Sequence, residues 1–176
     1  MENTPRYYAG IGSRNTPELV LEQMFKIASV MTKTFNFTLR SGGAGGADTA
    51  FEKGCDSANG LKNIYLPWDG FNGRGESFTQ VNTAAMEIAA IHHPNWNACS
   101  QAARKLHARN AFQVLGSDLK TPAELVICWT TEGKITGGTG QALRMAKFYK
   151  VPVVNLFGLS PSDIESQLNE IIHLGD

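Results

Sequence analysis

Short apolar segments alternate with longer segments of helical periodicity along this chain, and this alternation limits the possible folds more than any other feature. The predicted strands cover residues 6–11, 37–40, 61–66, 124–129 and 151–155. The predicted helices cover residues 17–35, 44–59, 78–90, 97–115, 141–149 and 163–172, the first with Thr16 as its N-cap. This order is typical of parallel sheets with helical crossovers. The sequence therefore predicts an α/β fold with about five mainly parallel strands and helices on both faces.

One domain, residues 1–176, is expected. The chain has 176 residues, of which 42% are hydrophobic, and this length suits a single buried core. Residues 67–76, PWDGFNGRGE, are too rich in Gly, Pro and Asn for a helix or strand, so we expect a long surface loop there. No segment has the composition of a linker between domains.

Charge and cysteine content limit the partners and the compartment. Sixteen Lys+Arg balance sixteen Asp+Glu, so no global positive field attracts nucleic acid or a membrane. Three cysteines (Cys55, Cys99 and Cys128) without CxxC spacing argue against a disulfide framework and a zinc ribbon. The N-terminus lacks a signal-peptide pattern, and no apolar segment reaches the ~20 residues that span a bilayer. We therefore expect a cytoplasmic protein without a membrane partner.

Three glycine-rich segments directly follow predicted strands: residues 10–14 (GIGSR), 41–48 (SGGAGGAD) and 136–140 (TGGTG). In an open parallel sheet, ligands bind beyond the C-terminal ends of the strands, so these loops should meet at one cleft. Glycine lets backbone N–H groups approach a ligand, and a following helix N-terminus attracts anions. A phosphate or nucleotide site is predicted, although each glycine segment alone is equally consistent with a tight structural turn. No cofactor is expected, because neither GxxxxGK[ST] nor a complete NAD fingerprint is present.

Two acidic residues follow the second glycine loop. Asp48 and Glu52 are four residues apart and share one helix face. A carboxylate there could bind a ribose hydroxyl or stabilise a cationic sugar during glycosidic cleavage. Both are therefore candidate catalytic residues, and the alternative is that they only stabilise the N-terminal part of the helix.

Basic and aromatic residues provide further candidates. Arg109, within the densest basic segment, and Arg14, in the first loop, could bind phosphate. A solvated surface is the expected place of Arg104 and Lys105. The aromatic residues Trp68, Phe71 and Trp96 could stack on a base, although burial as loop anchors is the favoured interpretation.

No metal site and no serine nucleophile are expected. His92, His93 and Cys99 are close in sequence, but adjacent histidines should point apart, and no further spaced ligand is evident. Ser13 and Ser41 lack a GxSxG context.

These motifs together resemble a known family. GSR before a helix, a strand entering SGGAGGAD, a Leu-Pro turn and Arg109-Asn110 are similar to DprA/Smf proteins. They are similar also to the wider SLOG superfamily, which includes LOG-type nucleoside-monophosphate phosphoribohydrolases. The resemblance covers residues 7–156 and implies a three-layer Rossmann-like sandwich that binds nucleotide or single-stranded DNA at its glycine loops. It also implies a homo-oligomer, with helix 97–115 or the last helix as a dimer face.

The last glycine motif departs from the LOG-type pattern PGGxGTxxE. Arg144 stands where those enzymes carry their catalytic glutamate, so glycosidic hydrolysis would require Asp48 or Glu52. Three functions are considered: binding of a nucleoside phosphate with N-glycosidic hydrolysis, single-stranded DNA binding in recombination, and sensing or sequestering a nucleotide signal without turnover. The predicted ligand-binding residues are Gly12, Ser13, Arg14, Ser41, Gly42, Gly43, Ala44, Gly45, Arg109, Asn110, Gly137, Gly138, Thr139, Gly140 and Trp68.

Overall fold

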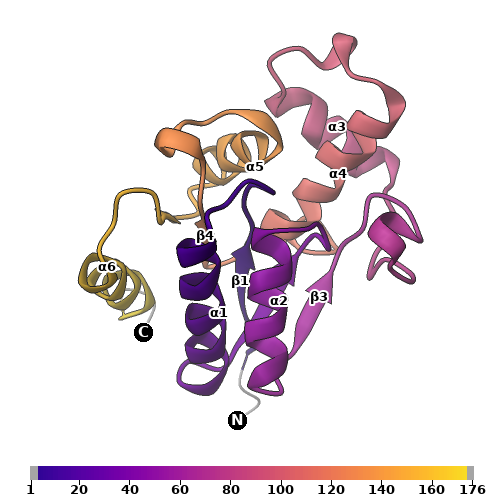
Figure 1. The fold of residues 1–176 in the computed structure, drawn as a ribbon. Helices are drawn as coiled ribbons and strands as arrows, with labels where there is room; N and C mark the ends of the chain where they lie inside the picture. Colours follow the sequence, from indigo (N-terminus) through magenta and orange to yellow (C-terminus); the bar gives the residue numbers. More distant parts are fainter. Residues whose placement is uncertain (1–3, 174–176) are drawn as a thin grey trace.

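A single parallel sheet forms the centre of the molecule (Figure 1). The computed structural model describes residues 4–173. Its strands are β1 (Arg6–Gly10), β2 (Phe37–Ser41), β3 (Lys62–Ile64), β4 (Leu125–Cys128) and β5 (Val153–Asn155). Their order is β3-β2-β1-β4-β5, and all four pairings are parallel. The predicted α/β class is confirmed, and the arrangement is consistent with a Rossmann-like fold.

Helices cover both faces of the sheet and give three layers (Figure 1). The helices are α1 (Glu18–Lys33), α2 (Ala47–Ser57), α3 (Thr83–His92), α4 (Gln101–Leu115), α5 (Gly137–Phe148) and α6 (Pro161–His173). Side chains of α1, α2 and α6 pack on one face, and those of α3, α4 and α5 pack on the other. Short 3-10 turns lie at Phe71–Gly73, Trp96–Ala98 and Thr131–Gly133.

The central strand β4 shows why the chain folds in this way. Successive strand side chains point to opposite faces. Leu125 and Ile127 accordingly contact the α1/α2/α6 layer, whereas Val126 and Cys128 contact the α3/α4/α5 layer. All four are buried. A strand covered on both faces must be apolar throughout, which is what the segment shows.

The strand order changes direction between β1 and β4, and this change positions the site. Strands β2 and β3 lie on one side of β1 in the sheet, and β4 and β5 lie on the other side. Gly10 of β1 pairs with Ile127 of β4, so both strands end at the same level. The loops that follow them begin at the crevice where parallel α/β sheets bind ligands.

Several predicted boundaries were wrong at helix N-termini. Thr16 is not the N-cap of α1: its Oγ1 donates to the Ser13 carbonyl at 2.6 Å, and Pro17 occupies the cap position. The second helix begins at Ala47 rather than residue 44, because Gly43 and Gly46 adopt φ of +67° and +74°. Helix α5 begins at Gly137 rather than residue 141, since its glycines form its first turn.

The predictions for loops and termini have mixed outcomes. Helices α3 and α4 begin a few residues later than predicted, after the side-chain caps Asn82 and Ser100. Residues 67–76 lack a regular helix or strand apart from the short turn Phe71–Gly73, as predicted. The signal-peptide prediction concerns in part residues 1–3, which lie outside the described residues. No helix within residues 4–173 has the length and apolar character needed to cross a membrane.

Candidate functional site

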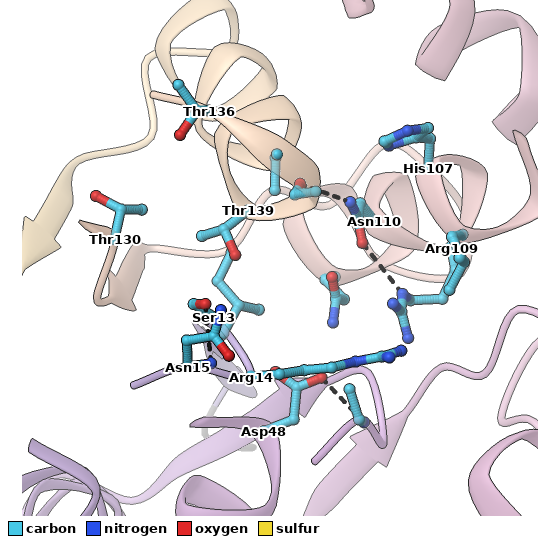
Figure 2. A pocket seen from close by; sticks show the side chains of 18 of the residues that line it. Ser13, Arg14, Asn15, Asp48, His107, Arg109, Asn110, Thr130, Thr136 and Thr139 are labelled. Atoms are coloured by element: carbon cyan, nitrogen blue, oxygen red, sulfur yellow. Dashed lines mark hydrogen bonds between the residues drawn. The ribbon is translucent and has the colours of Figure 1, made fainter. Parts of the chain in front are cut away.

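A cavity of about 480 Å³ lies at the C-terminal ends of β1 and β4 (Figure 2). Its walls come from the loop after β1, the start of α2, one face of α4, the loop after β4 and the first turn of α5. The predicted binding or catalytic residues that line it are Gly12, Ser13, Arg14, Ala44, Asp48, Arg109, Asn110, Gly137, Gly138 and Thr139. Residues from all three glycine-rich segments therefore border one space.

Direct contacts hold the first two glycine loops together. Gly46 has φ of +74°, and a Cβ added there would lie 2.9 Å from the Arg14 Cα. A Cβ on Gly12 would lie 2.7 Å from the Ala47 Cβ. At both positions, the turn after β1 and the loop after β2 approach each other so closely that only glycine fits. These two glycines therefore have a packing role in addition to any contact with a ligand.

Helix α4 connects the second glycine loop with the third. Arg109 Nη1 donates to the Gly42 carbonyl, and it donates also to the Tyr65 carbonyl at 3.3 Å. Asn110 Nδ2 donates to the Gly138 carbonyl at 3.1 Å. Adjacent residues of one helix thus fix both loops, which explains how segments far apart in sequence reach the same cavity.

The first turn of α5 offers free backbone donors to the cavity. The N-cap residue Thr136 makes no side-chain cap hydrogen bond. The first N–H groups of a helix have no partner within the helix, and together they carry a partial positive charge. Gly137, Gly138 and Thr139 occupy this turn and line the cavity. This geometry suits an anion.

Arg109 is a buried cation without a carboxylate partner. Its exposed fraction is 7%, and burial lowers the pKa of its guanidinium, which Asp48 partly restores. Within residues 4–173, no acidic side chain forms an ion pair with it at 4.0 Å or less. Backbone carbonyls orient it instead. Since an isolated buried charge is unfavourable, an anion in the cavity would compensate it.

Arg14 adds a second guanidinium on the same side. Its side chain extends across the cavity toward Arg109 (Figure 2). The proximity is also electrostatic, because the charge of Arg14 contributes to the lowered pKa of Arg109. Arg14 is exposed and makes no side-chain hydrogen bond or ion pair within the described part of the chain. Two converging guanidinium groups are suited to a phosphate, which accepts several hydrogen bonds at once.

Asp48 is the buried carboxylate of the cavity. Only 4% of this residue is exposed, and it lies in the first turn of α2. Burial raises its pKa to about 6, against the opposing effects of Arg109 and of the Ala44 N–H, which donates to Oδ2 at 3.2 Å. A carboxyl group with such a pKa exchanges protons near neutral pH, as general bases do.

Glu52 lies away from the cavity. Its carboxylate accepts two hydrogen bonds from Arg74, at 2.8 and 2.6 Å, and one from Lys62 at 3.0 Å. These cations hold the pKa of Glu52 below its ordinary value, although burial acts in the opposite direction. Glu52 does not line the cavity. It connects α2 with the loop at residues 67–76 and with β3, so its geometry is that of a structural ion pair.

The remaining predicted binding residues lie behind or beside the cavity lining. Ser41 Oγ donates to the Gly10 carbonyl at 2.7 Å and is fully buried. Gly42 supplies the carbonyl that holds Arg109, and Gly43 provides a positive-φ turn. Gly45 has no atom within 4 Å of a Cβ position and does not line the cavity. Gly140, in α5, is buried against the backbone of Ile135.

The aromatic candidates also lie outside the lining. Trp68 packs edge-on against Phe71 at 5.4 Å between ring centroids. Phe71 is buried, which fits the anchoring interpretation, whereas Trp68 is exposed and does not fit it. Trp96 contacts the His93 and His107 rings and the Arg104 guanidinium.

Sequence reasoning missed several lining residues, and some carried a usable signal. His107 lies three residues before Asn110, and Gln113 lies four after Arg109, so helical spacing places each on a face next to a predicted residue. Thr130 directly follows the apolar part of β4 and borders the cavity. Asn15 had no such signal, because its position depends on the path of an irregular loop.

A second group of polar side chains lies beside the cavity. His93, Cys99 and His107 each offer a ligand atom, and all three atoms lie within 4.8 Å of one another. The sequence-based argument that no further ligand completes the set was therefore wrong, because α4 brings His107 to the preceding loop. Its premise on orientation is confirmed: the His92 ring packs at a tilt against Phe148 instead, at 4.8 Å between ring centroids.

Comparisons with protein-family models, with curated proteins and with solved structures found no match to this chain.

Proposed function

We propose that the cavity binds a nucleoside 5′-monophosphate and that Asp48 promotes hydrolysis of its N-glycosidic bond. The observation that carries the proposal is that four features occur together in one cavity. These are two guanidinium groups, the uncapped first turn of α5, a buried carboxylate and the space of about 480 Å³ between them. Such a volume falls in the range of small-molecule sites.

The phosphate is assigned to the positive side of the cavity. Arg109 is oriented by backbone carbonyls, and Arg14 extends toward it. The N–H groups of Gly138 and Thr139 complete a set of donors from a third segment. Charge-assisted hydrogen bonds of this kind are stronger than neutral ones. The donors come from separate segments, so only the folded protein brings them together around one phosphate.

The chemistry requires only water and one carboxylate. A water molecule attacks C1′ of the ribose, the bond from C1′ to the base nitrogen breaks, and Asp48 takes the proton that the water loses. The base leaves with the bonding electrons and takes a proton from solvent, so the products are free base and ribose 5-phosphate. The carboxylate also stabilises the positive charge that develops on the sugar. His107 is neutral at pH 7, since burial and neighbouring cations lower its pKa to about 4.

We also propose that the chain belongs to the superfamily that its motifs resemble. SGGAGGAD forms the loop and first turn of α2 that deliver Asp48, and Arg109-Asn110 connects two glycine loops. These roles agree with membership of the DprA/Smf and LOG-type group. Arg144 does not replace the missing glutamate of the LOG-type motif, because its Nε donates to the His92 carbonyl at 2.8 Å. Asp48 is therefore the carboxylate to test.

The experiment combines binding with detection of free base. Purified protein is incubated with the four common ribonucleoside 5′-monophosphates and with the matching nucleosides, and the products are separated by chromatography. We expect free base from at least one monophosphate and none from its nucleoside. Asp48→Asn should retain binding and lose base release. Arg14→Gln should weaken binding about tenfold or more, since a hydrogen bond between charged groups contributes about 1.5–3 kcal/mol.

The control is Lys105→Gln, which removes a positive charge from α4 outside the cavity lining and should leave both readouts unchanged. Binding without base release would reject hydrolysis and favour a sensor or sequestering protein. No binding of monophosphates, together with tight and steeply salt-dependent binding of single-stranded DNA, would reject the proposal in favour of the recombination alternative.

A further inference from the structure

We propose that His93, Cys99 and His107 form a binding site for a zinc ion, or a similar borderline-soft divalent cation, at the edge of the cavity. Of the residues that the structure describes, these three form the one group of His, Cys, Asp and Glu side chains with metal-ligand spacing. Imidazole nitrogen and thiolate sulfur are common zinc ligands, and catalytic zinc sites have three protein ligands and one open position. The inference is independent of the proposed hydrolysis.

The ligand atoms of the group lie close enough to share one ion after the side chains reorient. Cys99 Sγ lies 3.6 Å from His93 Nε2 and 3.7 Å from His93 Nδ1. Zinc bonds of about 2.3 Å to sulfur and about 2.0–2.1 Å to nitrogen, at a tetrahedral angle, place the two ligand atoms about 3.6 Å apart. The His93 and His107 rings lie side by side, 4.5 Å apart between centroids. Because Cys99 Sγ is nearly equidistant from both His93 nitrogens, binding requires the His93 ring to rotate until one nitrogen points at the ion. Ligand atoms up to 4.8 Å apart must also approach by about 1 Å.

A second observation points to a ligand at this place. Nδ1 of His107 is buried and has no hydrogen-bond partner within the described residues. A buried ring nitrogen without a hydrogen-bond partner is unfavourable, and an ion bound at Nδ1 would supply the missing partner. His93 is held differently, because the Asn95 N–H donates to its Nδ1 at 3.1 Å. An ion on His93 therefore replaces this exposed backbone hydrogen bond, a small loss compared with a metal–ligand bond.

The location indicates what an ion would do. His93 and Cys99 lie in the segment between α3 and α4, near the short turn Trp96–Ala98, whereas His107 is on α4. The ion would fix this irregular segment to the helix that also carries Arg109. His107 borders the cavity (Figure 2). A fourth coordination position on that side would be open to water or ligand. Three protein ligands with one open position are characteristic of zinc sites that bind exogenous groups.

The test uses cobalt(II) as a spectroscopic probe and zinc(II) as the competitor, on the reduced full-length chain. We expect one cobalt ion to bind, with a thiolate-to-cobalt charge-transfer band and the visible absorption of tetrahedral cobalt, both abolished by zinc. Binding should release the thiol proton, which a weakly buffered titration measures. Cys99→Ser should remove the charge-transfer band. His107→Gln should weaken metal affinity by more than the ~10–100-fold typical for loss of an outer hydrogen-bond partner.

Matched controls separate this site from other ligands. His92→Gln changes the neighbouring histidine, whose ring packs against Phe148, and should leave metal binding unchanged. Cys55 and Cys128 are buried, and burial raises the pKa of Cys128 to about 12, so neither should contribute to the band. Thermal unfolding of each metal-free variant checks the fold. Absence of the charge-transfer band with excess cobalt, or its persistence in Cys99→Ser, would overturn the proposal.

Discussion

Replacing Asp48 by asparagine should make the protein more stable at neutral pH, although Asp48 lies in the candidate site. Burial raises the pKa of this carboxyl from 3.8 to about 6. Each tenfold change in an equilibrium corresponds to about 1.4 kcal/mol, so the ionised form costs the folded state about 3 kcal/mol relative to the neutral form. Asparagine has the same shape as the neutral acid and keeps an oxygen to accept from the Ala44 N–H.

The sign of the pH dependence follows from where the proton is bound. Between about pH 4 and pH 6, the native protein holds a proton at Asp48 that the unfolded chain has released, so this group makes stability fall as pH rises. The stability difference between Asp48→Asn and the wild type should therefore be near zero at about pH 4. It should reach about 3 kcal/mol in favour of the variant at about pH 7.5.

Urea unfolding at several pH values measures this difference. Glu52→Gln is the control, since Glu52 has a lowered pKa and paired charges. Its stabilising contribution is present above its unfolded pKa and is lost on acidification, so this variant should be less stable than the wild type near neutral pH. A stability difference for Asp48→Asn that does not change with pH, or a variant that is destabilised at neutral pH, would refute the reasoning.

Further substitutions test the positions around the cavity. Arg109→Lys keeps the charge but loses the fork that reaches the Gly42 carbonyl, so unfolding studies should show a loss of about 1–3 kcal/mol for the unsatisfied buried acceptor. Gly46→Ala places a non-glycine residue at positive φ, with its Cβ 2.9 Å from the Arg14 Cα. It should lower the free energy of unfolding by at least about 1–2 kcal/mol and weaken monophosphate binding in calorimetry. Trp68→Ala should change monophosphate affinity by less than about twofold, since Trp68 lies outside the lining and a twofold change equals about 0.4 kcal/mol.

The fold could be predicted because periodicity and strand burial act over short segments. The apolar segment around β4 has no polar alternation, as expected for a strand covered on both faces. Helix boundaries were less predictable, since they depend on backbone conformation. Gly43 and Gly46 delay the start of α2, whereas Gly137 and Gly138 form the first turn of α5. Glycine permits both outcomes, so sequence composition alone does not separate them.

The candidate site was predictable in its glycine loops and less so in its side-chain partners. Helix spacing placed Asp48 and Glu52 on one face, but contacts with Arg74 and Lys62 draw Glu52 away from the cavity. Those cations are 22 and 10 residues away in sequence, beyond the reach of a local pattern. His107 likewise joins His93 only because α4 folds back on the preceding segment. Tertiary contacts decide these pairings, and a pattern within one element does not contain them.

The central claim is that donors from three segments, the guanidinium groups of Arg14 and Arg109 and the first N–H groups of α5, surround one anion. NMR of backbone amides and arginine side chains measures this directly. The ¹⁵N-labelled protein is titrated first with inorganic phosphate and then with the nucleoside 5′-monophosphates. We expect the backbone amides of Gly138 and Thr139 and the side-chain Nε–H groups of Arg14 and Arg109 to shift together and saturate with the same dissociation constant. Shifts confined to one segment, or saturation of these groups at different ligand concentrations, would contradict the claim.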